Sequence, residues 1–319
     1  LKLSCETQLS MTAVSMMQTA QKVFSLKGIF PAITTPFDDN QEVFYEKLHQ
    51  NLQFYEKLPF TGYLINGSNG EVASLKFKER LQILQNVRQR VNPDRILIAN
   101  AYCESTKQCC ELTQSLASNG ADAVLVMLPF YHRRSLNEEA ILAHFRAVAD
   151  SSPVPVVIYN NPGVTNVNIS TQTVLRLADH PNIYGLKESD VANIAELVGE
   201  IKKKKLNFEV TQSSGCLLLQ SFVVGACGGM ISLPNILGQE VCQLYQLYRE
   251  NKLAEAAELQ FKLVRIDTLL MLANLGVPGL KATMDLLGLY GGPCRLPLQP
   301  LPSDDVKRLK DELVRHGFL

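Results

Sequence analysis

A lysine at the end of an apolar segment is the first residue of this sequence that could do chemistry. The segment 183–187 reads Ile-Tyr-Gly-Leu-Lys, and the period of two in a β-strand places Lys187 on the same face as Ile183 and Gly185. An ammonium buried among apolar side chains loses hydration, so its pKa falls and the neutral amine can attack a carbonyl carbon. Lys187 is therefore a candidate for Schiff-base formation. The alternative is a surface lysine that pairs with Glu188.

A tyrosine stands near the end of another apolar segment. The segment 156–160 finishes with Tyr159 and Asn160. A phenol at a strand end could carry a proton to or from a substrate that is bound as an imine. By itself, such a tyrosine is more often a packed core residue.

Two glycines follow a third apolar segment, in the turn Gly-Ser-Asn-Gly-Glu at 67–71. Glycine allows a tight turn, so the backbone N–H groups of Gly67, Ser68 and Asn69 could bind an anion, and the Ser68 hydroxyl could relay a proton. The lysine of a phosphate-binding loop is missing, so a carboxylate suits this turn better than a phosphate. The motif alone is a weak signal, because many barrel loops resemble it.

The sequence carries no pattern typical of a metal or cofactor site. His132 follows the segment 129–131, Pro-Phe-Tyr, and could act as a general base, although a lone loop histidine is more often a bystander. The other histidines lack metal-ligand spacing, and no His-Glu-x-x-His occurs. We expect neither a metal nor another cofactor.

These residues need a scaffold that brings the ends of several strands together. From residue 28 onward, short β-rich segments alternate with helical patterns, which is typical of a parallel sheet built from βα units. The expected strands are 29–34, 62–66, 96–100, 123–128, 156–160, 183–187, 208–212 and 229–232. The expected helices are 45–58, 77–91, 106–118 with Ser105 as N-cap, 138–149, 171–178, 193–203, 216–224 and 239–250.

Eight strands and eight helices predict an α/β fold, a closed (β/α)8 TIM barrel, whose active site lies at the C-terminal strand ends. A doubly wound sheet is the alternative, but it usually has fewer strands, and its Gly-x-Gly-x-x-Gly turn is missing here. Three further helical patterns, at 253–272, 279–287 and 304–315, have no strands between them. They predict a C-terminal three-helix extension.

We divide the chain into three parts. Residues 1–27 show no packed pattern and are expected to be a disordered leader or a mitochondrial presequence, although arginine is absent from them. Residues 28–250 are expected to form the barrel. Residues 251–319 are expected to be a helical extension of the same domain.

The composition excludes several classes of protein. Of 319 residues 46% are hydrophobic, and 31 basic residues balance 31 acidic ones, so no global charge favours nucleic acid or an anionic membrane. No apolar run approaches the roughly 20 residues of a transmembrane helix. The eight cysteines form no Cys-x-x-Cys pair, which indicates reduced thiols in an intracellular compartment.

Five motifs in register resemble the dihydrodipicolinate synthase and N-acetylneuraminate lyase family of class I aldolases, over about 28–319. They are the segments 28–37, 67–71, 129–131, 159–162 and 185–189. The resemblance implies that Lys187 forms the Schiff base, that Tyr159 transfers protons and that Ser68 relays them. It implies that the backbone of Gly67, Ser68 and Asn69 binds the carboxylate of a small 2-oxo acid. It also implies a homotetramer in which Tyr131 completes the relay in a neighbouring subunit's site.

Within the family, the sequence is most similar to the animal mitochondrial branch, which cleaves 4-hydroxy-2-oxoglutarate to pyruvate and glyoxylate. The similar segments are 103–106, 212–215, 276–281 and 290–299. On this resemblance, Gln212, Ser213 and Ser214 are expected to bind the substrate. A mitochondrial location is expected, with the cytoplasm as the alternative.

Three positions depart from the family's pattern. Val164 stands where dihydrodipicolinate synthases usually place an arginine that holds the carboxylate of their second substrate, which disfavours lysine biosynthesis. Asn166 replaces a glycine, and Gln212 replaces a small glycine. A long amide at position 212 could add a hydrogen bond to the substrate or fill its space.

Three functions therefore stay open for this sequence. The first is the aldolase acting on 4-hydroxy-2-oxoglutarate. The second is a related aldolase that acts on a 2-keto-3-deoxy sugar acid. The third, from another class, is a catalytically silent paralogue that is retained for binding or assembly.

Overall fold

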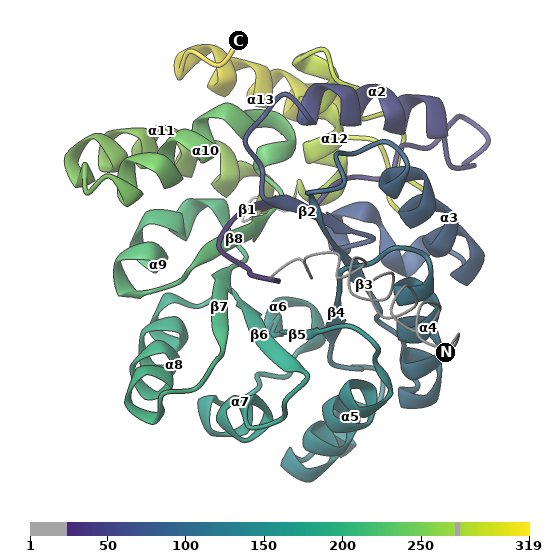
Figure 1. Cartoon of the computed structure of the whole chain (residues 1–319). Coiled ribbons are helices and arrows are strands. Elements are labelled where there is room, and N and C mark those ends of the chain that lie inside the picture. The colour runs from purple at the N-terminus through teal and green to yellow at the C-terminus, as the bar shows by residue number, and fades with distance from the viewer. Residues whose placement is uncertain (1–23, 272–274) are drawn as a thin grey trace, which may run out of the picture.

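Strands and helices alternate along the computed structural model, which describes residues 24–271 and 275–319 (Figure 1). The leader expected at 1–27 lies outside the described residues as far as residue 23. Its last residues belong to the barrel, because Leu26 is fully buried and its backbone N–H donates to the carboxylate of Glu209. The described residues before 28 thus already contact the barrel.

Eight parallel strands in the described residues form one closed sheet. They are β1 (Gly28–Pro31), β2 (Gly62–Ile65), β3 (Ile96–Asn100), β4 (Ala123–Met127), β5 (Val156–Tyr159), β6 (Ile183–Glu188), β7 (Glu209–Gln212) and β8 (Gly228–Ile231). Each strand from β2 to β8 pairs with the next, and β8 pairs with β1. A parallel bridge between Ala32 and Leu64 joins β1 to β2 and closes the ring. The prediction of a (β/α)8 barrel is confirmed.

The strands are buried on both faces, because side chains alternate between the barrel interior and the surrounding helices. Phe30, Ile98, Leu125 and Val157 belong to the interior cluster. At Gly185 a side chain has no room, since a Cβ there would lie 2.4 Å from the carbonyl oxygen of Glu209. The barrel interior is therefore packed at the level of Gly185. Lys187 lies two residues further along β6, toward the C-terminal end of the strand.

The helices around the barrel begin and end within about three residues of the predicted bounds, except the last, which begins at 234 and not at the expected 239. They are α2 (Tyr45–Tyr55), α3 (Phe77–Arg88), α4 (Thr106–Ser118), α5 (Glu138–Ser151), α7 (Thr171–Ala178), α8 (Val191–Lys204), α9 (Leu218–Val224) and α10 (Pro234–Arg249). Side chains of Asn137, Ser170 and Asp190 accept N-cap hydrogen bonds at α5, α7 and α8. Ser105 is the N-cap residue of α4, as predicted, although its side chain makes no such bond; its carbonyl oxygen accepts from the N–H of Cys109 at 2.9 Å.

The sequence patterns missed one short helix at the C-terminal end of the barrel. After β5 the chain forms α6 (Pro162–Thr165), which ends at Asn166 with a φ of 53°. A left-handed residue at this point favours glycine, and asparagine tolerates it better than most side chains. This explains how Asn166 can stand where the family usually has glycine.

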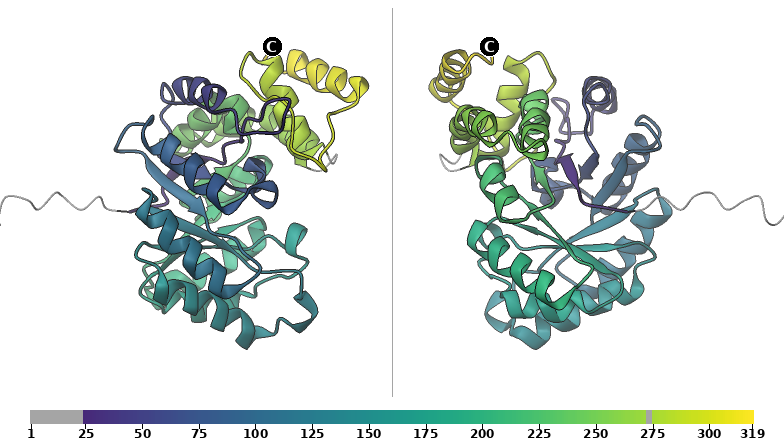
Figure 2. Two further views of the ribbon diagram at one scale, coloured as in Figure 1. Left: turned by 90° about the vertical axis from the view of Figure 1, so that its right-hand side faces the viewer. Right: turned by 60° about the vertical axis from the view of Figure 1, so that its left-hand side comes forward.

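The C-terminal extension consists of α11 (Leu253–Met271), α12 (Gly276–Leu286) and α13 (Ser303–Arg315). Figure 2 shows these helices, in green to yellow, gathered on one side of the barrel. Helix α11 packs against α9 and α10, and α12 and α13 pack against α11. None of the described helices combines the length and the apolar character that crossing a membrane requires.

Candidate active site

Lys187 points into the barrel from β6, and its side chain is almost completely buried, with 4% exposed. Its neighbours in the sheet are Tyr159 of β5 and Thr211 of β7, and its Nζ lies 4.1 Å from the centre of the Tyr159 ring. Burial removes water from the ammonium and lowers the pKa of Lys187 to about 7. A large fraction of this amine is therefore neutral near physiological pH, as a nucleophile requires.

Glu188 has other partners than Lys187. Its carboxylate accepts hydrogen bonds from Asn160 Nδ2 at 2.8 Å and from the backbone N–H groups of Ser189 and Asp190 at 2.7 and 3.2 Å. Adjacent residues of a strand face opposite sides of the sheet, so Glu188 points out of the barrel. The alternative of a surface lysine paired with Glu188 is thereby excluded.

The Tyr159 phenol lies between the lysine and the turn that follows β2. Asn161 Nδ2 donates to its hydroxyl oxygen at 2.9 Å, and the Ser68 side chain is a second hydrogen-bond partner. Burial raises the pKa of Tyr159 above its ordinary value, and the bonds with Asn161 and Ser68 lower it by less. The phenol is therefore protonated at neutral pH and is placed to give and retrieve a proton. Lys187, Tyr159 and Ser68 form one connected group.

The turn after β2 is a single 3-10 turn, Ser68–Gly70, preceded by Gly67. The first N–H groups of such a turn have no partner inside it. Thr35 Oγ1 donates to the carbonyl oxygen of Gly70 at 2.8 Å and holds the turn against the segment that follows β1. Gly67 is buried and Asn69 is half-buried beside Ser68. The structure thus brings the expected carboxylate-binding residues next to Tyr159.

Gln212 lies at the end of β7, but its side chain is fully buried and its polar atoms are already used. Its Nε2 donates to Ser221 Oγ of α9 at 2.6 Å, and its Oε1 accepts from the N–H groups of Ser213 and Ser214 at 2.6 and 2.9 Å. This geometry does not favour the expected contact between Gln212 and the substrate, because both ends of the amide are bonded within the protein. Gln212 shapes the turn that presents Ser213 and Ser214.

Sequence reasoning missed Asp267, which anchors the same turn from α11. Its Oδ2 accepts from Ser214 Oγ at 3.1 Å and from the N–H of Cys216 at 2.8 Å. Burial raises the pKa of Asp267. A signal was present in the sequence, because Asp267 interrupts the apolar face formed by Leu263, Ile266 and Leu270.

Tyr131 is not brought to the Lys187 group of its own chain. Its side chain is 77% exposed, and its backbone N–H donates to Glu104 Oε2 at 3.0 Å. The preceding Phe130 stacks on Tyr102 with ring centres 5.6 Å apart. The loop is therefore fixed at its base while the Tyr131 phenol projects outward.

A hollow of about 280 Å³ lies beside Ser68 at the barrel mouth. Its wall is mostly apolar and carries no cation. The lining residues are Ser68, Glu71, Val72, Ala73, Ser74, Tyr102, Met127, Phe130, Val164, Pro297 and Leu298. Val164 lies exposed on α6, so the position at which the resemblance leads us to look for an arginine is apolar here.

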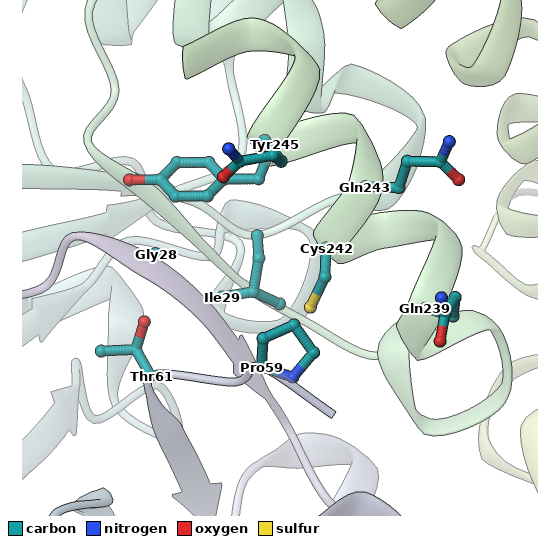
Figure 3. A pocket seen from close by; sticks show the side chains of 9 residues that line it. Gly28, Ile29, Pro59, Thr61, Gln239, Cys242, Gln243 and Tyr245 are labelled. Atoms are coloured by element: carbon teal, nitrogen blue, oxygen red, sulfur yellow. The ribbon is translucent and has the colours of Figure 1, made fainter. Parts of the chain in front are cut away.

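A second hollow, of about 550 Å³, lies at the opposite end of the barrel (Figure 3). Gly28 and Thr61 border it where β1 and β2 begin, and Gln239 and Gln243 border it on α10. Its wall has no carboxylate and no cation. None of the residues of the Lys187 group lines it.

No metal site is formed by the part of the chain that the structure describes. Groups of three or more His, Cys, Asp or Glu side chains that could hold an ion are absent from 24–271 and 275–319. His132 is exposed, and its ring packs edge-on against Tyr131 with centres 5.0 Å apart.

Comparison with known proteins places the whole barrel and extension in one group. The sequence model of the dihydrodipicolinate synthetase family matches residues 25–316. The 4-hydroxy-tetrahydrodipicolinate synthase of Methanothrix thermoacetophila is 31% identical over 298 residues, which are 92% of this chain and 98% of that protein. The enzyme of the same name from Pelobacter propionicus is 32% identical, over 92% of this chain and 99% of its own length.

Solved structures agree with these relatives. Dihydrodipicolinate synthase from Bacillus anthracis superimposes with a TM-score of 0.85 at 28% identity, over 92% of this chain and 99% of that one. The enzyme from Acinetobacter baumannii, solved in complex with pyruvate, gives a TM-score of 0.87 at 25% identity, over 92% and 100%.

The lowered pKa of Lys187 gives a direct test of the site. A neutral amine reacts and an ammonium does not, so acetylation of Lys187 by acetic anhydride, an electrophile that does not itself ionise, should rise with pH and reach half its maximal rate near pH 7. Peptide mass spectrometry over a pH series measures this rate. Nα-acetyl-lysine, whose free side-chain amine has a pKa of about 10.4, serves as the control. A midpoint for Lys187 that coincides with the control would contradict the assigned environment.

Proposed function

Because this chain belongs to the dihydrodipicolinate synthetase family, whose members are Schiff-base-forming carbon–carbon lyases, we propose that it cleaves 4-hydroxy-2-oxoglutarate to pyruvate and glyoxylate. The observation that carries the proposal is the buried Lys187 amine, whose Nζ lies 4.1 Å from the Tyr159 ring centre. Small 2-oxo acids are the electrophiles that such an amine takes up.

The first half of the reaction forms the imine. Neutral Lys187 Nζ attacks C2 of the 2-oxo acid and gives a carbinolamine, whose hydroxyl leaves as water once it receives a proton. The Tyr159 phenol is the donor within reach of Lys187, and Ser68 connects it to the barrel mouth. The N–H groups of the turn after β2 hold the C1 carboxylate.

The second half breaks the bond between C3 and C4. Tyr159, now a phenolate, takes the proton of the C4 hydroxyl, so glyoxylate leaves and the bonding electrons move into the iminium to give an enamine. Protonation at C3 and addition of water then release pyruvate and return the amine of Lys187. Each proton that Tyr159 gives is returned within the cycle, and no redox cofactor is required.

The residues at the barrel mouth favour a short aldehyde as the second product. In glyoxylate the carboxylate is attached directly to the reacting carbon, so it has to be bound deep in the mouth, where Ser213 follows β7 on the same face as Thr211. In aspartate semialdehyde the carboxylate lies three bonds from the reacting carbon. A cation at the rim would then be needed, and Val164 does not provide one.

Cleavage of a 2-keto-3-deoxy sugar acid is the second candidate. It is favoured by the wall beside Ser68, which is mostly apolar and carries no cation, since hydroxyl groups of a sugar acid need no cation. A silent paralogue is disfavoured by the intact group of Lys187, Tyr159 and Ser68. The mitochondrial location that the resemblance implies is part of the same proposal.

We also propose that the working enzyme is a homotetramer in which Tyr131 serves a neighbouring subunit. Two observations support this. The Tyr131 phenol is exposed on a loop whose base is fixed by Glu104, and a hollow with apolar walls lies beside Ser68, where a relay would continue. An aromatic ring from a second copy matches the chemistry of that hollow.

The first prediction of this proposal concerns substrate choice. Pyruvate should condense with aspartate semialdehyde at least roughly tenfold less efficiently than 4-hydroxy-2-oxoglutarate is cleaved, because Val164 offers no partner for the distal carboxylate. Coupled assays that measure kcat/KM for both reactions check this. Val164→Arg should raise the condensation, and Val164→Leu, which adds no charge, should not. Faster condensation than cleavage in the unaltered enzyme would overturn the substrate assignment.

The second prediction concerns the shared site. Tyr131→Phe and Lys187→Ala homo-oligomers should each be nearly inactive, because one lacks the relay phenol and the other the nucleophile. After dissociation and reassembly of an equal mixture, about one quarter of the sites should combine both intact residues if subunits pair at random. Recovery of activity in the mixture is the measurement. No recovery despite proven subunit exchange would mean that Tyr131 acts in its own chain or only packs.

A further inference from the structure

We propose that Lys281 of the C-terminal extension is a positioning residue for the carboxylate of the 2-oxo acid. This inference rests on the proposed function, since it assigns that carboxylate to the turn after β2. Lys281 acts through Glu71, which directly follows the turn, and it does not itself contact the substrate.

Lys281 and Glu71 form an ion pair inside the protein. Their side chains are each 1% exposed, and Lys281 Nζ lies 2.6 Å from Glu71 Oε1. The same ammonium donates to the carbonyl oxygen of Pro293 at 2.9 Å and lies 4.6 Å from the centre of the Phe37 ring. The other oxygen of Glu71 accepts from the backbone N–H of Arg295 at 2.9 Å. The carboxylate is thus held from α12 and from the tail that follows it.

The backbone of Glu71 explains why it has to be held. Its φ is 57°, in the left-handed region that non-glycine residues rarely adopt, and its N–H donates to the carbonyl oxygen of Ser68. Such a conformation persists when surrounding contacts fix it. If the ion pair is lost, Glu71 is free to relax to negative φ, and this would rotate the Ser68–Gly70 turn away from Tyr159.

A purely stabilising role accounts less well for the pair. Taking two charges out of water is costly, and an apolar pair of similar volume is often at least as stable. The ion pair supplies a fixed direction and distance between α12 and the turn. The tail reinforces the same region, because the Arg295 guanidinium binds both oxygens of Glu79 at 2.8 and 2.9 Å.

The test uses the full chain and pyruvate as the probe. Lys281→Met keeps the length of the side chain and removes the charge, so the pyruvate concentration that gives half-maximal borohydride-trapped adduct should rise roughly tenfold or more. The adduct level at saturating pyruvate should be nearly unchanged, because Lys187 is untouched. Because pyruvate alone is used, the outcome does not depend on which aldehyde the enzyme releases. If the enzyme proves not to cleave 4-hydroxy-2-oxoglutarate, this test of Lys281 therefore still stands on its own.

Two further variants separate positioning from stability. Arg265→Met is the matched control, since Arg265 pairs with Glu312 at 3.4 Å between α11 and α13, away from the turn; its half-saturation should stay unchanged. Glu71→Gln combined with Lys281→Met should be no worse than Lys281→Met alone, because both changes break one interaction. If Lys281→Met does not fold, Glu71→Gln alone provides the same readout. Unchanged pyruvate half-saturation in the folded variant, whatever its Tm, would overturn the proposal.

Discussion

The desolvation of one ammonium group is the constraint on which the rest of this structure depends. Lys187 can react with a carbonyl only as a neutral amine, and the barrel achieves this by surrounding it with strands that are buried on both faces. Gly185, two residues before Lys187 in β6, has no side chain, so β7 and the interior core pack closely next to Lys187. Glu188, the nearest carboxylate along the chain, faces the opposite side of the sheet and is occupied by Asn160 and backbone N–H groups. Burial therefore sets the pKa of Lys187 without a competing ion pair.

A reactive amine at the centre of a barrel still needs a mouth that keeps its shape, and the C-terminal extension provides this from outside the ring of strands. Asp267 of α11 holds the turn after β7 through Ser214 and Cys216, and Lys281 of α12 holds the turn after β2 through Glu71. Both anchors are buried ionisable groups, which are costly unless they are satisfied by specific partners. Their placement indicates that the extension contributes to the geometry of the site as well as to the stability of the fold.

The fold and the burial of Lys187 inside the barrel could be predicted because they depend on local periodicity. Alternation along β6 is sufficient to place Lys187 inside the barrel, and the repetition of strand and helix is sufficient to predict closure. Other features depend on contacts between distant segments. The direction of Gln212 is decided by Ser221 on α9, and the buried position of Leu26 is decided by the carboxylate of Glu209 and by the barrel interior. Lys281 reads as an ordinary helix residue until α12 is packed near the turn after β2. The roles of Tyr159, Ser68 and Tyr131 came from resemblance, and the structure places the first two together while Tyr131 points outward.

The central claim is that Lys187 is the one residue that forms a Schiff base, and reductive trapping tests it most directly. The protein is incubated with pyruvate, reduced with borohydride, digested and mapped by mass spectrometry, with Lys187→Ala as the control. We predict a single adduct on the peptide that contains Lys187, and none in the control. Lys281 offers an internal comparison, because it is also buried but is paired with a carboxylate. An adduct on Lys281 or on any other lysine, or an adduct that persists in Lys187→Ala, would contradict this account.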